Sequence, residues 1–149
     1  LQVLAVPVDN KGKEKIAMVH EKAAAGYIKG FADREYIREL DSFHLPWLPT
    51  GASFRAFEIS GDSMPPIQAG SVVLGKYVEK DQIKIGERYI LVNKEGIVFK
   101  RVYLPPREGG DDSLLLTSDN PLFAPYEIHF QDVLEVWQFY AYIAMCKDK

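Results

Sequence analysis

Residues 87–104 read ERYILVNKEGIVFKRVYL and contain two runs rich in Val, Ile, Tyr and Phe. The polar connection 93–96 joins the two runs and ends in a glycine, which can adopt the positive φ angles that tight turns need. Side chains of these types are enriched in β-strands. The stretch therefore predicts a β-hairpin with strands at 87–93 and 96–104.

Comparable short runs recur along the rest of the chain and are separated by Gly, Pro, Asn and Asp, which favour turns. We expect further strands at 3–8, 54–60, 71–78, 113–117 and 132–145. One helix is predicted after Asp33, because this residue can cap the segment REYIREL, in which apolar residues recur at three- and four-residue spacing. The sequence therefore predicts a mainly β domain of short twisted sheets with one short helix.

The composition is typical of one folded domain without a membrane segment. Of the 149 residues, 47% are hydrophobic, which is enough for one substantial core. No apolar run approaches the roughly 18 to 20 residues that a membrane-spanning helix needs. The single cysteine, Cys146, excludes an intramolecular disulfide and a multi-cysteine metal site and is consistent with a reducing compartment. We expect a cytoplasmic protein that makes no contact with a membrane and needs no metal or cofactor.

The chain is expected to divide into two parts. Residues 1–30 are predicted to form a linker and cleavage-site region, because their lysines are accompanied by glutamates, as on a solvated surface. Residues 31–149 are predicted to form the folded domain. The net charge of -3 and the lack of a second long helical pattern argue against a DNA-binding module within this chain. A DNA-binding domain is expected upstream, outside this sequence.

Residues 58–66, EISGDSMPP, lead from a predicted strand into a sharp turn. Gly61 allows the chain to bend, Ser63 projects from the turn, and Met64 follows it as a support. The backbone N–H groups of Asp62 and Ser63 can converge on one point, as an oxyanion hole requires. Taken alone, a Gly-Asp-Ser sequence is more often an ordinary turn than a catalytic site.

Lys100 lies in the second strand of the predicted hairpin, among the apolar residues of IVFKRV. Burial disfavours the charged form of a lysine, so a desolvated Lys100 could accept a proton. Serine is a weak nucleophile until an adjacent base removes its proton, and a serine-lysine pair is one known form of this arrangement. Taken alone, such a lysine is more often an exposed residue of an edge strand. Together, Ser63 and Lys100 are the candidate nucleophile and general base.

The run GDSMPP at 61–66, FKR at 99–101, the turn SDNP at 118–121 and the terminal strand resemble the LexA, UmuD and phage-repressor family of self-cleaving serine peptidases. The resemblance spans residues 20–145. It implies a LexA-like or signal-peptidase-like β fold. It also implies that the serine of the turn is the nucleophile and the strand lysine the general base, roles that fall on the pair identified above.

The same resemblance implies self-cleavage at a bond between two small residues upstream of the nucleophile. The segment KAAAGY at 22–27 makes the bond between Ala25 and Gly26 the candidate scissile bond. Small residues allow a bent segment to enter a narrow cleft, and a bond on the same chain has a high effective concentration. Taken alone, the segment also fits a flexible hinge between an upstream domain and this one.

The resemblance further implies a homodimer that forms through the C-terminal strand. A RecA-type filament, as in the SOS response, is a candidate activator, and the sequence leaves open whether another ligand has that role. The long aromatic segment 133–143 is consistent with either an interface or a buried strand. Cleavage would separate an upstream helix-turn-helix domain from the dimer and weaken its binding to DNA.

Two other functions stay open from the sequence. In the first, the serine-lysine pair is a relic, and the domain is a catalytically silent dimerisation and binding module of a transcription regulator. In the second, the chain is a signal-peptidase-type serine peptidase that acts in trans, although the sequence shows no membrane anchor of the kind such enzymes use.

Overall fold

A computed structural model describes residues 3–145 of the protein, so that Cys146 lies outside the described residues. The strands form one open sheet in the order β2-β1-β3-β4-β9-β5-β6-β7-β8. Their bounds are β1 Ile16–Val19, β2 Ser42–Phe43, β3 Phe54–Glu58, β4 Val72–Val78, β5 Arg88–Asn93, β6 Gly96–Tyr103, β7 Ser113–Thr117, β8 Tyr126–His129 and β9 Val133–Ile143. The α-helices are α1 Ala24–Gly30 and α2 Arg34–Glu39, with 3-10 turns at Glu21–Ala23, Lys80–Gln82, Gly110–Asp112 and Phe130–Asp132. The prediction of a mainly β fold is confirmed.

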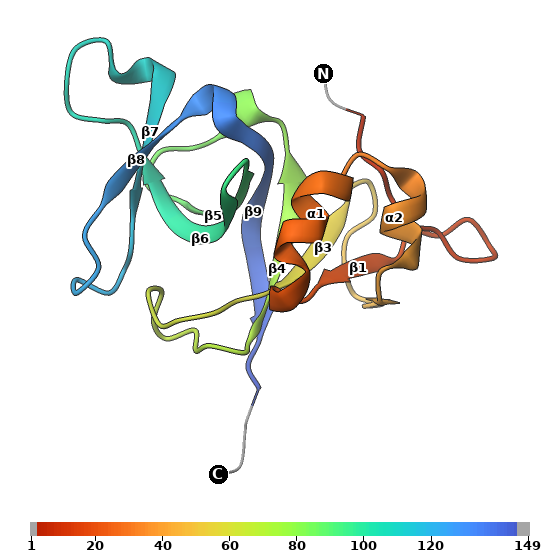
Figure 1. Ribbon diagram of the computed structural model, residues 1–149. Helices are drawn as coiled ribbons and strands as arrows, with labels where there is room; N and C mark the ends of the chain where they lie inside the picture. The colour runs from red at the N-terminus through yellow and green to blue at the C-terminus, as the bar shows by residue number, and fades with distance from the viewer. Residues whose placement is uncertain (1–2, 146–149) are drawn as a thin grey trace.

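Strand β9 joins the two halves of the sheet. It pairs antiparallel with β4 along one edge and with β5 along the other. Figure 1 shows β5–β8 curling away on one side of β9, while β1, β3 and both helices lie on the other side. Trp137 of β9 is fully buried, and its ring packs against Phe57 and Tyr77 at centroid distances of 5.8 and 5.2 Å. The last strand in the sequence, β9, therefore contributes a central residue to the main core.

Strands β5 and β6 form the predicted hairpin, in which Asn93 pairs with Gly96 and Tyr89 with Lys100. The side chain of Asn93 closes the turn, because its Oδ1 accepts hydrogen bonds from the N–H groups of Glu95 and Gly96 at 2.9 and 3.2 Å. The register of the hairpin fixes the position of Lys100 along β6, and this position determines which residues its amine can contact.

The other predicted elements form with two kinds of exception. Strands β3, β4, β7 and β9 and helix α2 occur where expected, and the side chain of Asp33 accepts a hydrogen bond from the N–H of Glu35 at 2.9 Å. The prediction of a strand at 3–8 is wrong, because this segment forms no strand and only Val8 makes an isolated bridge, with Glu14. The short strands β1, β2 and β8 and the helix α1 were not predicted. No helix within the described residues combines the length and the apolar character that a membrane crossing needs.

From residue 16 onward, the segment expected as a linker contains elements of the folded domain. Strand β1 pairs in parallel with β3, in a register that places Met18 opposite Ala56. Helix α1 follows and buries Tyr27 completely against the main core. The segment that carries the candidate cleavage site is therefore ordered and packed.

A buried polar cluster fastens α1 to the sheet. The hydroxyl of Tyr27 donates to Glu135 Oε1 at 2.5 Å and accepts from Arg55 Nη1 at 2.8 Å. Trp137 Nε1 donates to the same Glu135 oxygen at 3.1 Å, and Arg55 Nη2 donates to the carbonyl of Ala5 at 2.6 Å. Arg55 and Glu135 are each 1% exposed. Burial raises the pKa of Glu135, although Arg55 opposes this effect.

The contact between α1 and α2 leaves no room for a side chain at Gly30. A Cβ added there would stand 2.6 Å from Tyr36 Cγ. We expect Gly30→Ala to lower the free energy of unfolding by about 1 to 3 kcal/mol through overpacking, despite the better helix propensity of alanine. Denaturant unfolding measures this loss. Gly96→Ala is the matched control, because an added Cβ at Gly96 meets no atom within 4 Å. An equal loss in both variants would contradict the packing argument.

Candidate active site

The turn that carries Ser63 is held by its neighbours in the sequence. The chain leaves β3 after Glu58, and Gly61 adopts a positive φ of 74°, as a glycine in a sharp turn can. On the other side of Ser63, Met64 and Ile67 are 3% and 2% exposed and belong to the main core. Because the residue next to Ser63 is anchored in the core, the half-buried serine has a fixed position.

The peptide groups around Ser63 have fixed carbonyls and free N–H groups. The carbonyl of Asp62 accepts a hydrogen bond from Asn120 Nδ2 at 3.2 Å, and the carbonyl of Ser63 accepts one from the Asn120 N–H at 3.0 Å. Within the described residues, the N–H groups of Asp62 and Ser63 donate to no backbone acceptor. Two donors are thus available for a developing negative charge, which is what an oxyanion hole needs.

Lys100 reaches from β6 to the loop that joins β7 and β8. Its Nζ donates a hydrogen bond to Ser118 Oγ at 2.7 Å and lies 5.5 Å from the centroid of the Phe123 ring. Burial of the amine lowers the pKa of Lys100. The adjacent Arg101 is instead paired with a carboxylate, since it donates two hydrogen bonds of 2.9 Å to Asp119. Lys100 therefore contacts a neutral hydroxyl, while the nearby carboxylate of Asp119 is paired with Arg101.

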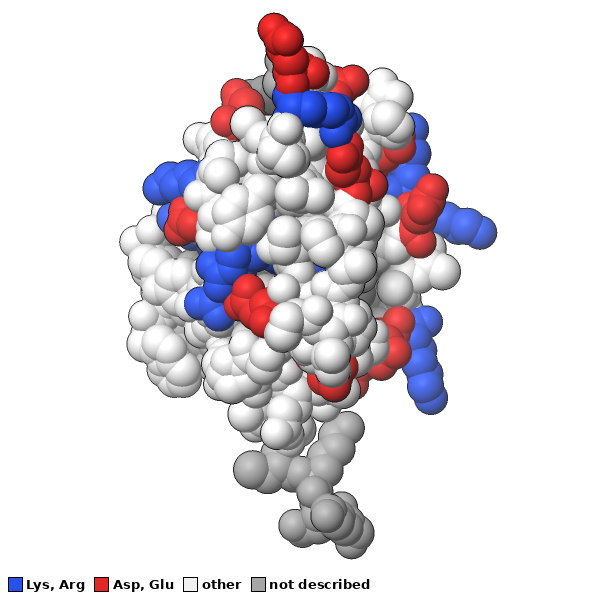
Figure 2. Space-filling model, turned by 90° about the vertical axis from the view of Figure 1, so that its left-hand side faces the viewer, with Lys and Arg blue, Asp and Glu red and all other residues white. Residues whose placement is uncertain are grey.

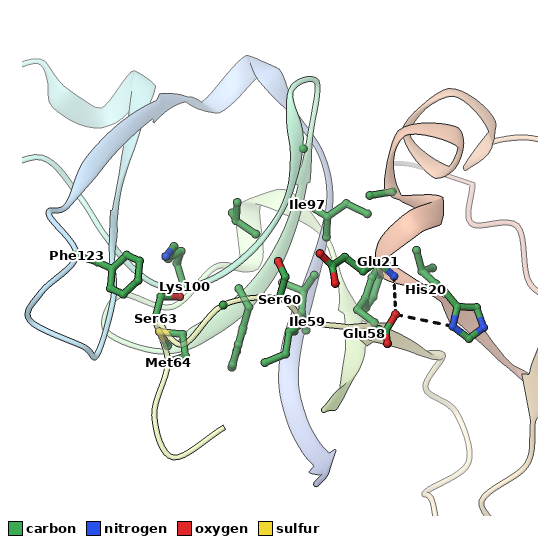
Figure 3. Close-up of a pocket in the computed structure, with 18 of the residues that line it drawn as sticks. His20, Glu21, Glu58, Ile59, Ser60, Ser63, Met64, Ile97, Lys100 and Phe123 are labelled. Carbon is green, nitrogen blue, oxygen red and sulfur yellow. Dashed lines mark hydrogen bonds and ion pairs between the residues drawn. The ribbon is translucent and has the colours of Figure 1, made fainter. Parts of the chain in front are cut away.

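Ser63 and Lys100 line the same cavity, which has a volume of about 470 Å³. Figure 3 shows both residues at one end of the cavity together with Phe123, while His20 and Glu58 lie at the other end. The lining of the cavity is mostly apolar and includes Val19, Phe57, Ile59, Ile90, Ile97, Val98 and Phe99. The cavity can therefore take an extended peptide with small apolar side chains next to a hydroxyl and a desolvated amine.

The structure does not bring the bond between Ala25 and Gly26 to Ser63. The bond lies within α1, and both residues are exposed. Ala24 lines the cavity, whereas Ala25 and Gly26 are not part of its lining. Gly26 also has a packing role, because a Cβ added there would stand 3.3 Å from the hydroxyl oxygen of Tyr36. The bond would have to leave the helix before it could meet the serine.

Contacts at the far end of the cavity hold the start of the α1 segment. His20 Nε2 lies 2.9 Å from Asp41 Oδ2, and His20 Nδ1 lies 3.9 Å from Glu58 Oε1. The same Glu58 oxygen accepts a hydrogen bond from the N–H of Glu21 at 2.8 Å. These contacts tie the residues before α1 to the end of β3, which is the strand that leads to the serine turn.

The sequence alone assigns no role to Ser118 and Asn120, although Ser118 contacts Lys100 and Asn120 contacts Ser63. Their one signal in the sequence is the turn SDNP at 118–121, which is part of the family resemblance. Within residues 3–145, no group of three or more His, Cys, Asp or Glu side chains is placed to hold a metal ion.

The face formed by the β5–β8 half of the molecule carries mixed charges. Figure 2 shows Lys and Arg side chains on this face interspersed with Asp and Glu and separated by uncharged surface. The uncharged part of the protein surface includes Leu122, Phe123 and Tyr126, which are 90%, 40% and 42% exposed. A basic patch of the kind that binds nucleic acid is not seen on this face.

A comparison with known protein families matches residues 17–137 to the family described as Peptidase S24-like. No individual curated protein matches the chain closely enough to count as a relative. The matched range covers most of the chain and includes Ser63, Lys100 and the loop between β7 and β8. The chain therefore belongs to the Peptidase S24-like family, which is a family of serine peptidases.

Proposed function

We propose that this chain is the self-cleavage and dimerisation domain of a cytoplasmic, LexA-like or phage-repressor-like transcription regulator, and that it cuts its own bond between Ala25 and Gly26. The proposal rests on the cavity that Ser63 and Lys100 share, in which the pKa of Lys100 is lowered and its amine contacts a neutral hydroxyl. Such an amine loses its proton more readily than an exposed lysine and can then act as a base.

In the proposed reaction, the neutral amine of Lys100 takes the proton of Ser63 Oγ while this oxygen attacks the carbonyl carbon of Ala25. The N–H groups of Asp62 and Ser63 bind the resulting oxyanion. Protonated Lys100 then gives its proton to the nitrogen of Gly26 as the C–N bond breaks. Neutral Lys100 then takes a proton from water as the water oxygen attacks the acyl ester, and it gives this proton to Ser63 Oγ as the ester bond breaks and the upstream fragment leaves.

Helix α1 has to open before its bond can enter the cavity. The helix has seven residues and is too short to persist by itself, so its stability depends on the buried Tyr27. Opening would withdraw the Tyr27 hydroxyl from both Arg55 and Glu135, which would leave buried charges with fewer partners. This cost supports slow spontaneous cleavage, and an activator such as a RecA-type filament would act by favouring the open form.

The end of β9 supports the proposed homodimer. Tyr140, Tyr142 and Ile143 are 45%, 40% and 43% exposed in the single chain, and aromatic residues are enriched in protein interfaces. A DNA-binding domain upstream of this chain would lose its link to the dimer when the bond is cut. The two copies would then bind their half-sites independently and more weakly.

A catalytically silent dimerisation and binding module is the second candidate. Two observations favour it: the candidate bond is held in a helix, and the hydrogen bond that Lys100 Nζ makes goes to Ser118 Oγ and not to Ser63. A peptidase that acts in trans is a third candidate and predicts cleavage of an added peptide without self-cleavage.

We expect the purified chain, incubated at mildly alkaline pH, to yield fragments 1–25 and 26–149, because higher pH increases the neutral fraction of Lys100. Intact mass spectrometry identifies the fragments. Ser63→Ala should stay whole, whereas Ser53→Ala, which removes a serine hydroxyl outside the cavity lining, should be cut like the unchanged protein. An uncut chain at every pH, with and without an activated RecA-type filament, would favour the silent module.

A further inference from the structure

The loop between β7 and β8 contacts both members of the candidate pair. Ser118 accepts the hydrogen bond of Lys100, and Asn120 binds the carbonyls of Asp62 and Ser63. We propose that Ser118 and Asn120 are positioning residues, the first for the lysine amine and the second for the peptide group between Asp62 and Ser63, whose N–H is one of the two proposed oxyanion donors. This inference rests on the proposed serine-lysine reaction and adds two residues to it.

Ser118 is placed to orient an amine that would otherwise rotate freely. A lysine side chain has four rotatable bonds, and fixing them has an entropic cost that a single 2.7 Å hydrogen bond helps to offset. Ser118 is itself held, because Thr117 pairs with Arg101 across the β6–β7 ladder and Asp119 binds the Arg101 side chain. The two anchors on either side of Ser118 leave its hydroxyl little freedom to move.

The direction of this hydrogen bond matters for the chemistry. Lys100 Nζ donates and Ser118 Oγ accepts. A neutral amine has two N–H groups and one lone pair, so donation of one N–H to Ser118 leaves the lone pair available for the proton of Ser63. As long as the neutral amine keeps this direction of donation, Ser118 holds it without competing for the electron pair that makes it a base.

Asn120 fixes two consecutive peptide groups. In a trans peptide, the C=O and the following N–H point in opposite directions. When Asn120 Nδ2 binds the Asp62 carbonyl, it sets the direction of the Ser63 N–H, which is one of the proposed oxyanion donors. The Asn120 backbone N–H holds the Ser63 carbonyl, which belongs to the next peptide group and carries no proposed oxyanion donor. The Asn120 side chain is oriented in turn, because its Oδ1 accepts from the N–H of Leu122 at 3.0 Å.

The first test removes the Ser118 hydroxyl. We expect Ser118→Ala to lower the maximal rate of self-cleavage by about 10- to 100-fold, the loss that misplacement of a reacting group causes. The pH midpoint of the rate should also move to lower pH, because the variant lacks an acceptor that favours the ammonium form of Lys100. Ser118→Thr restores a hydroxyl and should recover most of the rate. Thr117→Ala removes the neighbouring hydroxyl, which points to the Arg101 carbonyl, and should leave rate and midpoint unchanged.

The second test removes the Asn120 side chain but keeps its backbone N–H. We expect Asn120→Ala to lower the rate by about 10- to 100-fold at every pH without moving the midpoint, because it disturbs one oxyanion donor, the N–H of Ser63, and not the base. A general collapse of the loop would change the midpoint as well, since Ser118 belongs to the same loop. A shifted midpoint in Asn120→Ala would therefore overturn the separate roles of the two residues.

A third measurement does not depend on cleavage. In the Ser63→Ala background, the 13Cε resonance of Lys100 reports its titration, and Ser118→Ala should displace that titration to lower pH. If the titration moves but the unchanged protein is never cut, the proposed self-cleavage fails while the placement of the amine by Ser118 stands. If the unchanged protein is cut but Ser118→Ala alters neither the rate nor the titration, the positioning role of Ser118 is wrong.

Discussion

Replacing Arg55 with methionine is expected to lower the free energy of unfolding by about 3 to 5 kcal/mol, the usual cost of breaking a buried ion pair from one side. Arg55 and Glu135 are each 1% exposed, so no solvent can take over the role of the guanidinium. The variant also loses the donor to the Tyr27 hydroxyl and the donor to the Ala5 carbonyl. Urea unfolding, followed by tryptophan fluorescence, measures the change.

The loss in Arg55→Met should depend on pH. Without Arg55, the pKa of the buried Glu135 rises further above its ordinary value, because the opposing effect of the guanidinium is gone. When a carboxyl group has a raised pKa in the folded state, the free energy of unfolding falls as the pH rises, since the group ionises first in the unfolded chain. The difference in the free energy of unfolding between Arg55→Met and the unchanged protein should therefore be larger at about pH 8 than at about pH 5.

Two controls accompany the Arg55 experiment. Lys84→Met removes an exposed cation and should change stability by less than about 0.5 kcal/mol. The double variant Arg55→Met with Glu135→Met removes the orphaned charge and should be more stable than Arg55→Met alone. If Arg55→Met costs no more than Lys84→Met, the buried cluster does not hold the fold as described.

Lys100→Met should slow self-cleavage by about 100- to 10,000-fold, the range that loss of a general base covers. Methionine keeps the approximate length and apolar stem of the lysine but has no amine to accept the proton. In the unchanged protein, the rate should rise with pH and level off with a midpoint below 10.5, the ordinary value, because burial lowers the pKa of Lys100. In Lys100→Met this pH dependence should disappear.

Fragment formation over time, followed by mass spectrometry across pH, measures both effects. Lys94→Met is the matched control, because Lys94 lies in the turn of the same hairpin and its side chain is 62% exposed beside Asp132. It should be cut at the rate of the unchanged protein. Equal rates for Lys100→Met and Lys94→Met would show that the amine of Lys100 is not the base.

The hairpin could be predicted because its signals are local, whereas the roles of the candidate site residues stay predictions. The strands and turn of 87–104 are specified by neighbouring residues, and Ser63 and Lys100 each lie in a short run with its own chemistry. Helix α1 could not be predicted in this way. Its glycines lower helix propensity, and it depends on a hydrogen bond from Tyr27 to Glu135.

The remaining differences also have tertiary causes. The segment 3–8 resembles a strand, but the carbonyl of Ala5 binds the buried Arg55 instead of a neighbouring strand. Ser118 and Asn120 acquire their contacts only when the β7–β8 loop folds back against β6 and the serine turn. In the sequence, a short polar turn that packs against a site looks the same as a short polar turn that is exposed to solvent. The scissile bond and the dimer stay predictions.

The distance in sequence between Tyr27 and Glu135 has a consequence for the protein during its synthesis. The two residues are 108 positions apart, so a ribosome that adds about 5 to 20 residues per second takes roughly 5 to 20 s to deliver the second after the first. Throughout that interval the tyrosine has no carboxylate to bind, and β9 has not yet joined the halves of the sheet. Emergence of the last strand is thus the moment at which α1 can dock, and a nascent chain stalled before that point would present its small-residue segment undocked.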